Sequence, residues 1–160
     1  MVSVALKING KYHTLDVEPT EVLAETLRER LGLTGVKVSC NEGECGSCTV
    51  ILNEKPVASC MVLTCRADGC EVTTIEGLAQ NGKLHPIQQA FIDEHGFQCG
   101  FCTPGIILSA KVLIDKNPDP SPEEISEALN GHICRCGNYP AIMRSVLRAA
   151  EIIREGNNHE

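Results

Sequence analysis

Aromatic side chains and long apolar runs are scarce in this chain. Only 3% of its 160 residues are aromatic, and tryptophan is absent. Hydrophobic residues still make up 42% of the chain, so we expect a globular core built from Val, Ile, Leu and Ala. No apolar stretch reaches the length of about 18 residues that a membrane-spanning helix needs, which argues against a span.

Clusters of positive charge are also missing. The chain has 14 Lys and Arg against 21 Asp and Glu, a formal net charge of −7, and the charges are well mixed. The absence of a basic run argues against nucleic-acid binding. The segment Met1–Lys7 lacks the pattern of a signal peptide, and a twin-arginine motif is absent. We therefore expect a cytoplasmic protein, where thiols stay reduced.

Cysteine, by contrast, is abundant: there are ten, and eight form two groups with different spacing. The first group has the spacing C-x4-C-x2-C-x11-C and consists of Cys40, Cys45, Cys48 and Cys60. The second has the spacing C-x2-C-x31-C-x-C and consists of Cys99, Cys102, Cys134 and Cys136. Four thiolates are what a 2Fe–2S cluster requires, and C-x4-C-x2-C…C is typical of plant-type ferredoxins. The pattern predicts a two-cluster electron carrier rather than a catalyst of bond chemistry.

Zinc is the main alternative for these cysteines, because zinc ribbons use paired C-x2-C motifs. However, zinc knuckles do not usually use C-x4-C-x2-C, and a C-x-C pair is tight for a tetrahedral structural site. A disulfide framework does not suit a reducing compartment. Cys65 and Cys70 lie outside both groups, and we expect them to be small, buried or partly buried residues without a ligand role.

Histidine ligation is not expected, because a Rieske centre replaces two cysteines by histidine and both groups here are complete. His132 lies two residues before Cys134. It is either a hydrogen-bond partner of a cluster or of another subunit, or, as we favour, a surface histidine or one at a helix C-terminus. The sequence shows no Ser-His-Asp arrangement, no P-loop and no G-x-G-x-x-G, so nucleotide binding by this chain is not expected.

The first half of the chain is expected to form a small mixed sheet with one helix. Apolar and polar residues alternate over 2–8 and 11–17 around Asn9-Gly10, which predicts a hairpin. A second hairpin is predicted for 49–52 and 56–59, followed by a short strand at 71–75.

The helix of this half is predicted for residues 21–31. Thr20 is the expected N-cap and Gly32 the expected stop. Between this helix and the second hairpin, Gly43 and Gly46 let the chain wrap closely around a metal.

The second half is expected to be helical, with helices at about 85–95, 105–116, 122–130 and 140–155. Ser121-Pro122-Glu123-Glu124 predicts a capping box at the start of the third helix. The resulting organisation is α+β: a sheet domain at 1–77, a linker at 78–84 and a helical domain at 85–160.

An internal repeat supports the helical half. Gly96 lies three residues before Cys99, and Gly131 lies three residues before Cys134. A proline follows each cysteine pair. Each repeat therefore predicts a helix, a glycine stop, two cysteines and a second helix. Two such helical hairpins would each donate two thiolates to one shared cluster.

The cysteine motifs resemble those of the molybdenum hydroxylases, the xanthine oxidase family. The segment 40–50, CNEGECGSCTV, is similar to the family's ferredoxin-type cluster loop. The segment 98–105, QCGFCTPG, and the Cys134-Arg135-Cys136 triplet are similar to its second-cluster motifs. The resemblance covers essentially the whole chain and fits the small, separate iron–sulfur subunit of this family.

The resemblance implies an N-terminal β-grasp, plant-type ferredoxin-like domain and a C-terminal four-helix-bundle 2Fe–2S domain. It also implies an electron-transfer subunit of a multi-subunit oxidoreductase. Electrons would pass from a molybdopterin centre on a large subunit through the helical-domain cluster and the ferredoxin-type cluster, usually to FAD on a third subunit. By the same resemblance, Gln98 contacts the pterin and Cys136 is the cluster ligand nearest to it.

Some residues depart from the family pattern without removing a ligand. Ser39 and Ser47 stand where Gly and Ala are common, and His132 stands where the family often has Asn. The segment Gly137-Asn138-Tyr139 replaces a frequent Thr-Gly-Tyr. Two other interpretations stay open at this stage: a stand-alone two-cluster ferredoxin and a zinc-stabilised interaction module. The substrate of a complete enzyme is not encoded here, because its pocket lies on the large subunit.

Overall fold

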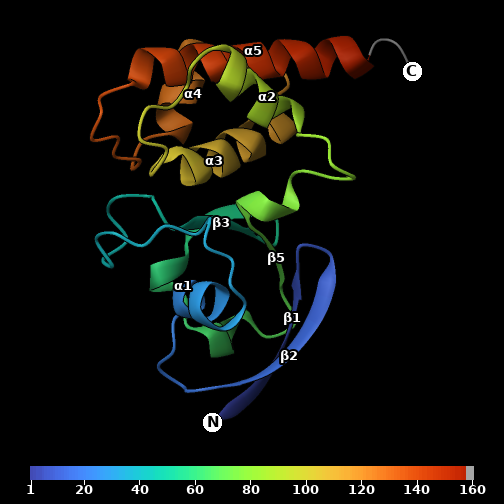
Figure 1. The fold of residues 1–160 in the computed structure, drawn as a ribbon, viewed down its shortest axis with the longest axis vertical. Coiled ribbons are helices and arrows are strands. Elements are labelled where there is room, and N and C mark those ends of the chain that lie inside the picture. Colours follow the sequence, from blue (N-terminus) through green and yellow to red (C-terminus); the bar gives the residue numbers. More distant parts are fainter. Residues whose placement is uncertain (158–160) are drawn as a thin grey trace.

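The computed structural model describes residues 1–157 and has a five-stranded mixed sheet in its N-terminal half (Figure 1). The strands lie in the order β2-β1-β5-β3-β4. Only the β1–β5 pair is parallel; the other neighbours are antiparallel. Their bounds are β1 Val2–Ile8, β2 Lys11–Val17, β3 Thr49–Leu52, β4 Lys55–Ala58 and β5 Glu71–Thr73.

Both predicted hairpins are confirmed, and each turns through two residues with positive φ. Asn9 has φ 49° and Gly10 has φ 80°, while Asn53 has φ 44° and Glu54 has φ 66°. Two consecutive left-handed residues match the right-handed twist of the flanking strands. Strand β4 therefore begins at Lys55, one residue before the predicted start.

The predicted helix is present but starts later than expected. Helix α1 spans Leu23–Glu25 and continues as a π-helical turn over Thr26–Arg30. The prediction that Thr20 caps it is wrong: Val22 occupies the N-cap position and makes no side-chain cap bond. The residues before α1 are extended because Val22 forms a β-bridge with Leu63.

Strand β3 lies in the middle of the molecule and contributes to two apolar cores. Val50 packs with Leu6, Leu23 and Leu27, so α1 covers one face of the sheet. Its neighbour Ile51 points the other way and belongs to the core of the helical half. This alternation follows from the two-residue period of a strand, and Figure 1 shows helix α3 next to β3 on that second side.

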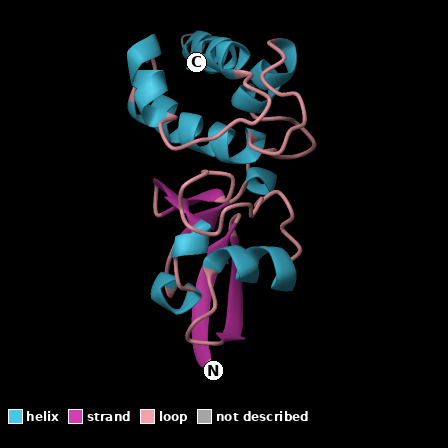
Figure 2. Ribbon diagram, turned by 90° about the vertical axis from the view of Figure 1, so that its left-hand side faces the viewer, coloured by secondary structure: helices cyan, strands magenta, loops and turns pink. Residues whose placement is uncertain are grey.

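Four α-helices follow in the described part of the chain, as the sequence predicts (Figure 2). They are α2 Pro86–Asp93, α3 Thr103–Lys116, α4 Pro122–Ala128 and α5 Tyr139–Asn157. The predicted capping box is confirmed: the Ser121 hydroxyl accepts from the Glu124 N–H at 3.2 Å, and the Glu124 carboxylate accepts from the Ser121 N–H at 2.7 Å. An unpredicted second box, formed by His85 and Gln88, starts α2.

The end of α2 differs from the expected glycine stop. His95, with φ 54°, is the left-handed residue, and the N–H of Gly96 returns to the carbonyl of Phe91 at 2.8 Å. Gly96 is needed for space, because an added Cβ would lie 2.4 Å from the hydroxyl of Ser145 on α5.

The segment that joins the two halves is attached to the sheet half by hydrogen bonds and to the helical half by a buried side chain. The Asn9 side chain accepts from the Thr74 N–H at 2.9 Å, and the Glu76 carboxylate accepts from the Gly35 N–H at 2.7 Å. Leu78 is buried in the helical core. Among residues 1–157, no helix combines the length and apolar character of a membrane span.

Candidate metal centres

The first candidate site consists of Cys40, Cys45, Cys48 and Cys60. Its thiols lie close enough to affect one another's pKa values: Cys45 acts on Cys40, and both Cys48 and Cys40 act on Cys60. Three lie on the loop before β3, and Cys60 lies in a single 3-10 turn, Ser59–Met61, after β4. The Ser59 hydroxyl donates to the Cys48 carbonyl at 2.6 Å, which fixes that turn beside the loop. Cys48 and Cys60 are buried, whereas Cys40 and Cys45 are half-buried.

Thiol pKa values in the first site reflect this mixture of environments. Backbone N–H groups of Glu42 and Cys45 lower the pKa of Cys40 to about 7; the Glu42 nitrogen lies 3.4 Å from the Cys40 sulfur. Burial, reinforced by the thiol of Cys48, raises the pKa of Cys60 to about 11. The surroundings of Cys40 therefore stabilise its thiolate. The buried Cys60 needs a nearby cation to be stable as a thiolate.

The second site consists of Cys99, Cys102, Cys134 and Cys136. Cys102 lies at the N-cap of α3, and Cys134 lies in the turn between α4 and α5. These two are buried, and Cys99 and Cys136 are exposed. Burial, together with the thiol of Cys134, raises the pKa of Cys102 to about 12.

Cys134 is the thiol of the second site that its surroundings favour as thiolate. Burial alone raises its pKa, but the N–H groups of Asn138, Cys136 and Gly137 and the thiol of Cys102 bring it below its ordinary value. Backbone N–H groups directed at sulfur are the donors that a cluster ligand needs.

Tyr139 holds the turn that carries Cys134, a role that the sequence did not reveal. Its hydroxyl accepts from the Cys134 N–H at 2.9 Å and donates to the His132 carbonyl at 3.2 Å. The neighbouring Asn138 amide donates to the His95 carbonyl at 2.9 Å, which joins this turn to the one after α2. These bonds connect the two helical hairpins that the repeat predicts.

The two sites touch each other directly. The Ile133 N–H donates to the Cys45 carbonyl at 3.0 Å. Gly105, on the first turn of α3, lies so close to the first-site loop that a Cβ there would be 2.3 Å from the Gly46 carbonyl oxygen. A ligand loop of one site and a ligand turn of the other are therefore in van der Waals and hydrogen-bond contact.

The remaining predicted residues occupy separate positions. Gln98 is exposed beside Cys99, and Cys136 is exposed after the Cys134 turn. Cys65 lies near the Pro19 carbonyl, and Cys70 accepts from the side-chain amide of Asn53 at 3.2 Å.

Both sites fit a 2Fe–2S cluster by the chemistry of their donors. All eight cysteines are free thiols, and four thiolates divided between two irons hold such a cluster. Two buried polar atoms, Thr103 Oγ1 and His132 Nδ1, have no partner among the described residues. In the sequence, Thr103 follows Cys102, and His132 lies two residues before Cys134. Among residues 1–157, no three Cys, His, Asp or Glu side chains are placed to hold one metal ion, and this applies to both cysteine groups.

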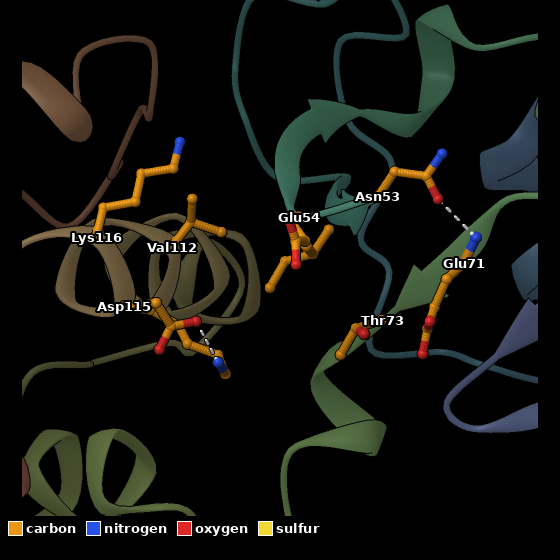
Figure 3. A pocket seen from close by; sticks show the side chains of 9 residues that line it. Asn53, Glu54, Glu71, Thr73, Val112, Asp115 and Lys116 are labelled. Carbon is orange, nitrogen blue, oxygen red and sulfur yellow. Dashed lines mark hydrogen bonds and ion pairs between the residues drawn. The ribbon is translucent and has the colours of Figure 1, made fainter.

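A cavity of about 670 Å³ lies elsewhere, between the β3–β4 turn and α3 (Figure 3). Lys111 pairs with Asp115 on its wall, and the Asn53 side chain accepts from the Glu71 N–H. None of the cysteines lines it. The two groups of four free cysteines, rather than this cavity, are the candidate sites of redox chemistry, and they indicate the class of two-cluster iron–sulfur proteins.

Comparison with known proteins agrees with this class. Residues 6–76 match the family model for the 2Fe-2S iron-sulfur cluster binding domain, and residues 74–147 match that for the 2Fe-2S binding domain. The chain is 47% identical over 150 residues to the nicotinate dehydrogenase small FeS subunit of Eubacterium barkeri, covering 94% of this chain and 96% of that protein.

Solved structures give the same result. The chain superposes on a chain of quinoline 2-oxidoreductase from Pseudomonas putida 86 with a TM-score of 0.92 and 41% identity, covering 97% of both. Against aldehyde oxidoreductase from Desulfovibrio gigas the TM-score is 0.92 with 43% identity, covering 98% of this chain but 18% of that one. The chain belongs to the molybdenum hydroxylase (xanthine oxidase) family, as one of its small iron–sulfur subunits with two 2Fe–2S clusters.

Proposed function

We propose that this chain carries electrons from a molybdopterin centre on a large partner subunit to FAD on a third subunit. Bound 2Fe–2S clusters supply one-electron transfer. In this proposal Cys40, Cys45, Cys48 and Cys60 hold one cluster, and Cys99, Cys102, Cys134 and Cys136 hold the other. The protein positions the clusters and tunes them with N–H donors, and the organic step takes place on the partner.

Four exposed apolar side chains close in sequence to the second-site cysteines are the observation that carries the proposal. Phe97 and Phe101 flank Cys99, while Ile133 and Tyr139 flank the Cys134 turn, and all four side chains are exposed. Permanent subunit interfaces are large and apolar, and exposed apolar patches mark interaction sites. These four side chains support docking of the large subunit here.

Gln98 precedes Cys99 of the second site, Cys136 is one of that site's cysteines, and both residues are exposed. Their exposure leaves them accessible to a cofactor on a partner. We propose that the Gln98 side chain hydrogen-bonds the pterin and that Cys136 is the second-site ligand closest to it.

A separate exposed apolar group lies at the first site. Met61 is 62% exposed, and its side chain covers Gly43 of the ligand loop. Val38 and Leu63 are also exposed. We propose that the FAD-binding subunit docks over these residues, so that the two partners approach different cysteine sites.

The proposal also assigns the parts of the chain. Residues 1–77 would form the ferredoxin-like domain, 78–84 the linker and 85–160 the helical domain, of which residues 158–160 lie outside the described part of the chain. Ten free thiols suit a reducing compartment, so we propose that the protein acts in the cytoplasm.

The test is affinity purification of the chain from its native cells, with iron, molybdenum and flavin measured in the eluate. Co-elution with a larger, molybdenum-containing chain is the expected result. An iron-rich chain that elutes without molybdenum would favour the alternative, a stand-alone two-cluster ferredoxin. A colourless chain containing zinc would contradict both.

A further inference from the structure

His132 belongs to the turn of the second site, yet its side chain lies against the loop of the first. A Cβ added to Gly46 would lie 2.5 Å from His132 Nδ1, so the imidazole fills the space that glycine leaves. Gly46 stands between Cys45 and Cys48. The expectation of a surface histidine is therefore wrong, because the residue is half-buried between the two sites. The other expected position, at a helix C-terminus, agrees with the structure, since the His132 N–H donates to the carbonyl of Leu129 at the end of α4.

The other edge of the ring is fixed by α3. His132 Nε2 lies 2.7 Å from the hydroxyl of Ser109, a buried residue of α3. The N-cap residue of α3 is Cys102, a proposed ligand of the second site. The imidazole thus connects three parts of the structure: the α3 helix, the Cys134 turn and the first-site loop.

The chemistry of the ring argues that it is more than a space-filling group. Nδ1 is buried and has no hydrogen-bond partner among the described residues, and an unpaired buried polar atom costs about 1–3 kcal/mol. An apolar side chain of similar size would avoid that cost. A buried polar group kept under such a penalty calls for a specific explanation.

We propose that His132, held by Ser109, is a positioning residue that sets the separation and orientation of the two cluster-binding loops. The Ile133–Cys45 backbone hydrogen bond joins the loops at one point, and the imidazole supports them at a second. Two points of contact prevent the loops from pivoting about a single bond. The inference deepens the proposed electron transfer and rests on it for its consequence, because exchange of an electron between two clusters depends on their spacing.

The test uses the purified holoenzyme with both clusters reduced. Two paramagnetic clusters close together split each other's electron paramagnetic resonance lines, and the splitting reports their distance and orientation. We expect Ser109→Ala and His132→Ala to keep the iron content of the wild type and to change or abolish the splitting. His132→Asn, which retains a polar planar group, should restore part of it. Ser126→Ala, an exposed serine on α4, is the matched control and should leave the spectrum unchanged.

The result that would overturn the inference is an unchanged splitting in Ser109→Ala with both clusters bound. Loss of iron in Ser109→Ala would also overturn it. In that case His132 and Ser109 would be needed to keep a cluster bound, not to set the distance between the two cluster-binding loops. If His132→Ala fails to fold, Ser109→Ala alone decides the question. The proposed function is tested separately, since it fails when no molybdenum-containing partner co-purifies, whatever the splitting shows.

Discussion

The backbone N–H of Ile133 donates a hydrogen bond of 3.0 Å to the carbonyl of Cys45. This bond joins residues 88 positions apart in the sequence: Cys45 belongs to the first cysteine group, and Ile133 precedes Cys134 of the second. The two sites are therefore parts of one continuous structure rather than independent modules on a flexible connection.

Gly46→Ala should destabilise the protein more than Gly69→Ala. Both glycines have positive φ, 70° and 74°, so each substitution costs about 1–2 kcal/mol of backbone strain. At Gly46 the new methyl also meets His132 and the Gly131 carbonyl, whereas nothing lies within 4 Å of the methyl at Gly69. Overpacking adds about 1–3 kcal/mol. Thermal melts with iron analysis measure the difference; equal effects would show that the junction is not tightly packed.

Ile133→Asp should weaken assembly with the molybdenum-containing subunit. Ile133 is 56% exposed in the isolated chain, and burying such a side chain at an interface contributes about 1.5–3 kcal/mol, which corresponds to a factor of about ten or more in affinity. Tyr12→Asp is the control, because Tyr12 is 85% exposed on β2, away from both sites. The measurement is the amount of molybdenum recovered per chain. Equal losses in both variants would contradict the proposal that the large subunit docks beside the second site.

Glu21→Gln should lower stability near neutral pH and matter less in acid. Glu21 is buried and its carboxylate pairs with Arg30 at 2.5 Å. Burial alone raises its pKa, but hydrogen bonds from Thr26 and Arg30 and the charge of Arg30 bring the pKa below its ordinary value. A lowered carboxyl pKa contributes stability above the ordinary pKa, and this is lost as pH falls through the lowered value.

Hydrogen bonds to a charged group contribute about 1.5–3 kcal/mol, which sets the expected difference between wild type and Glu21→Gln near neutral pH. Unfolding midpoints measured from neutral to acidic pH should converge. Glu123→Gln, on the exposed start of α4, should show no such convergence. A difference for Glu21→Gln that stays constant with pH would mean that the carboxylate charge is not what stabilises this position.

Local patterns in the sequence predicted local structure well. Asn9-Gly10 between alternating residues specified a hairpin, and Ser121 with Glu124 specified a helix start, because each depends on a few neighbouring residues. Thr20 failed as a cap because a long-range pairing, the Val22–Leu63 bridge, keeps the preceding chain extended. His85 was not recognised as a cap because histidine is an uncommon residue at that position.

Spacing in the sequence predicts which cysteines form each group, and this grouping stays a prediction. The residues that support the two groups could not be predicted. Tyr139 and Ser109 act through contacts with residues far along the chain or in another element. The same holds for the contact of Gly105 with the Gly46 carbonyl. Spacing within a motif carries no information about which element packs on it, so these roles became visible only in three dimensions.

The central claim is that two separate sets of four cysteines each hold one 2Fe–2S cluster. Cys60→Ser and Cys102→Ser test it most directly, with iron content and electron paramagnetic resonance of the reduced protein as the measurement. We predict two distinct signals in the wild type, loss of one in Cys60→Ser and of the other in Cys102→Ser, each with half the iron. Cys65→Ser and Cys70→Ser should keep both signals. A single signal in the wild type, or the same signal lost in both variants, would contradict the account.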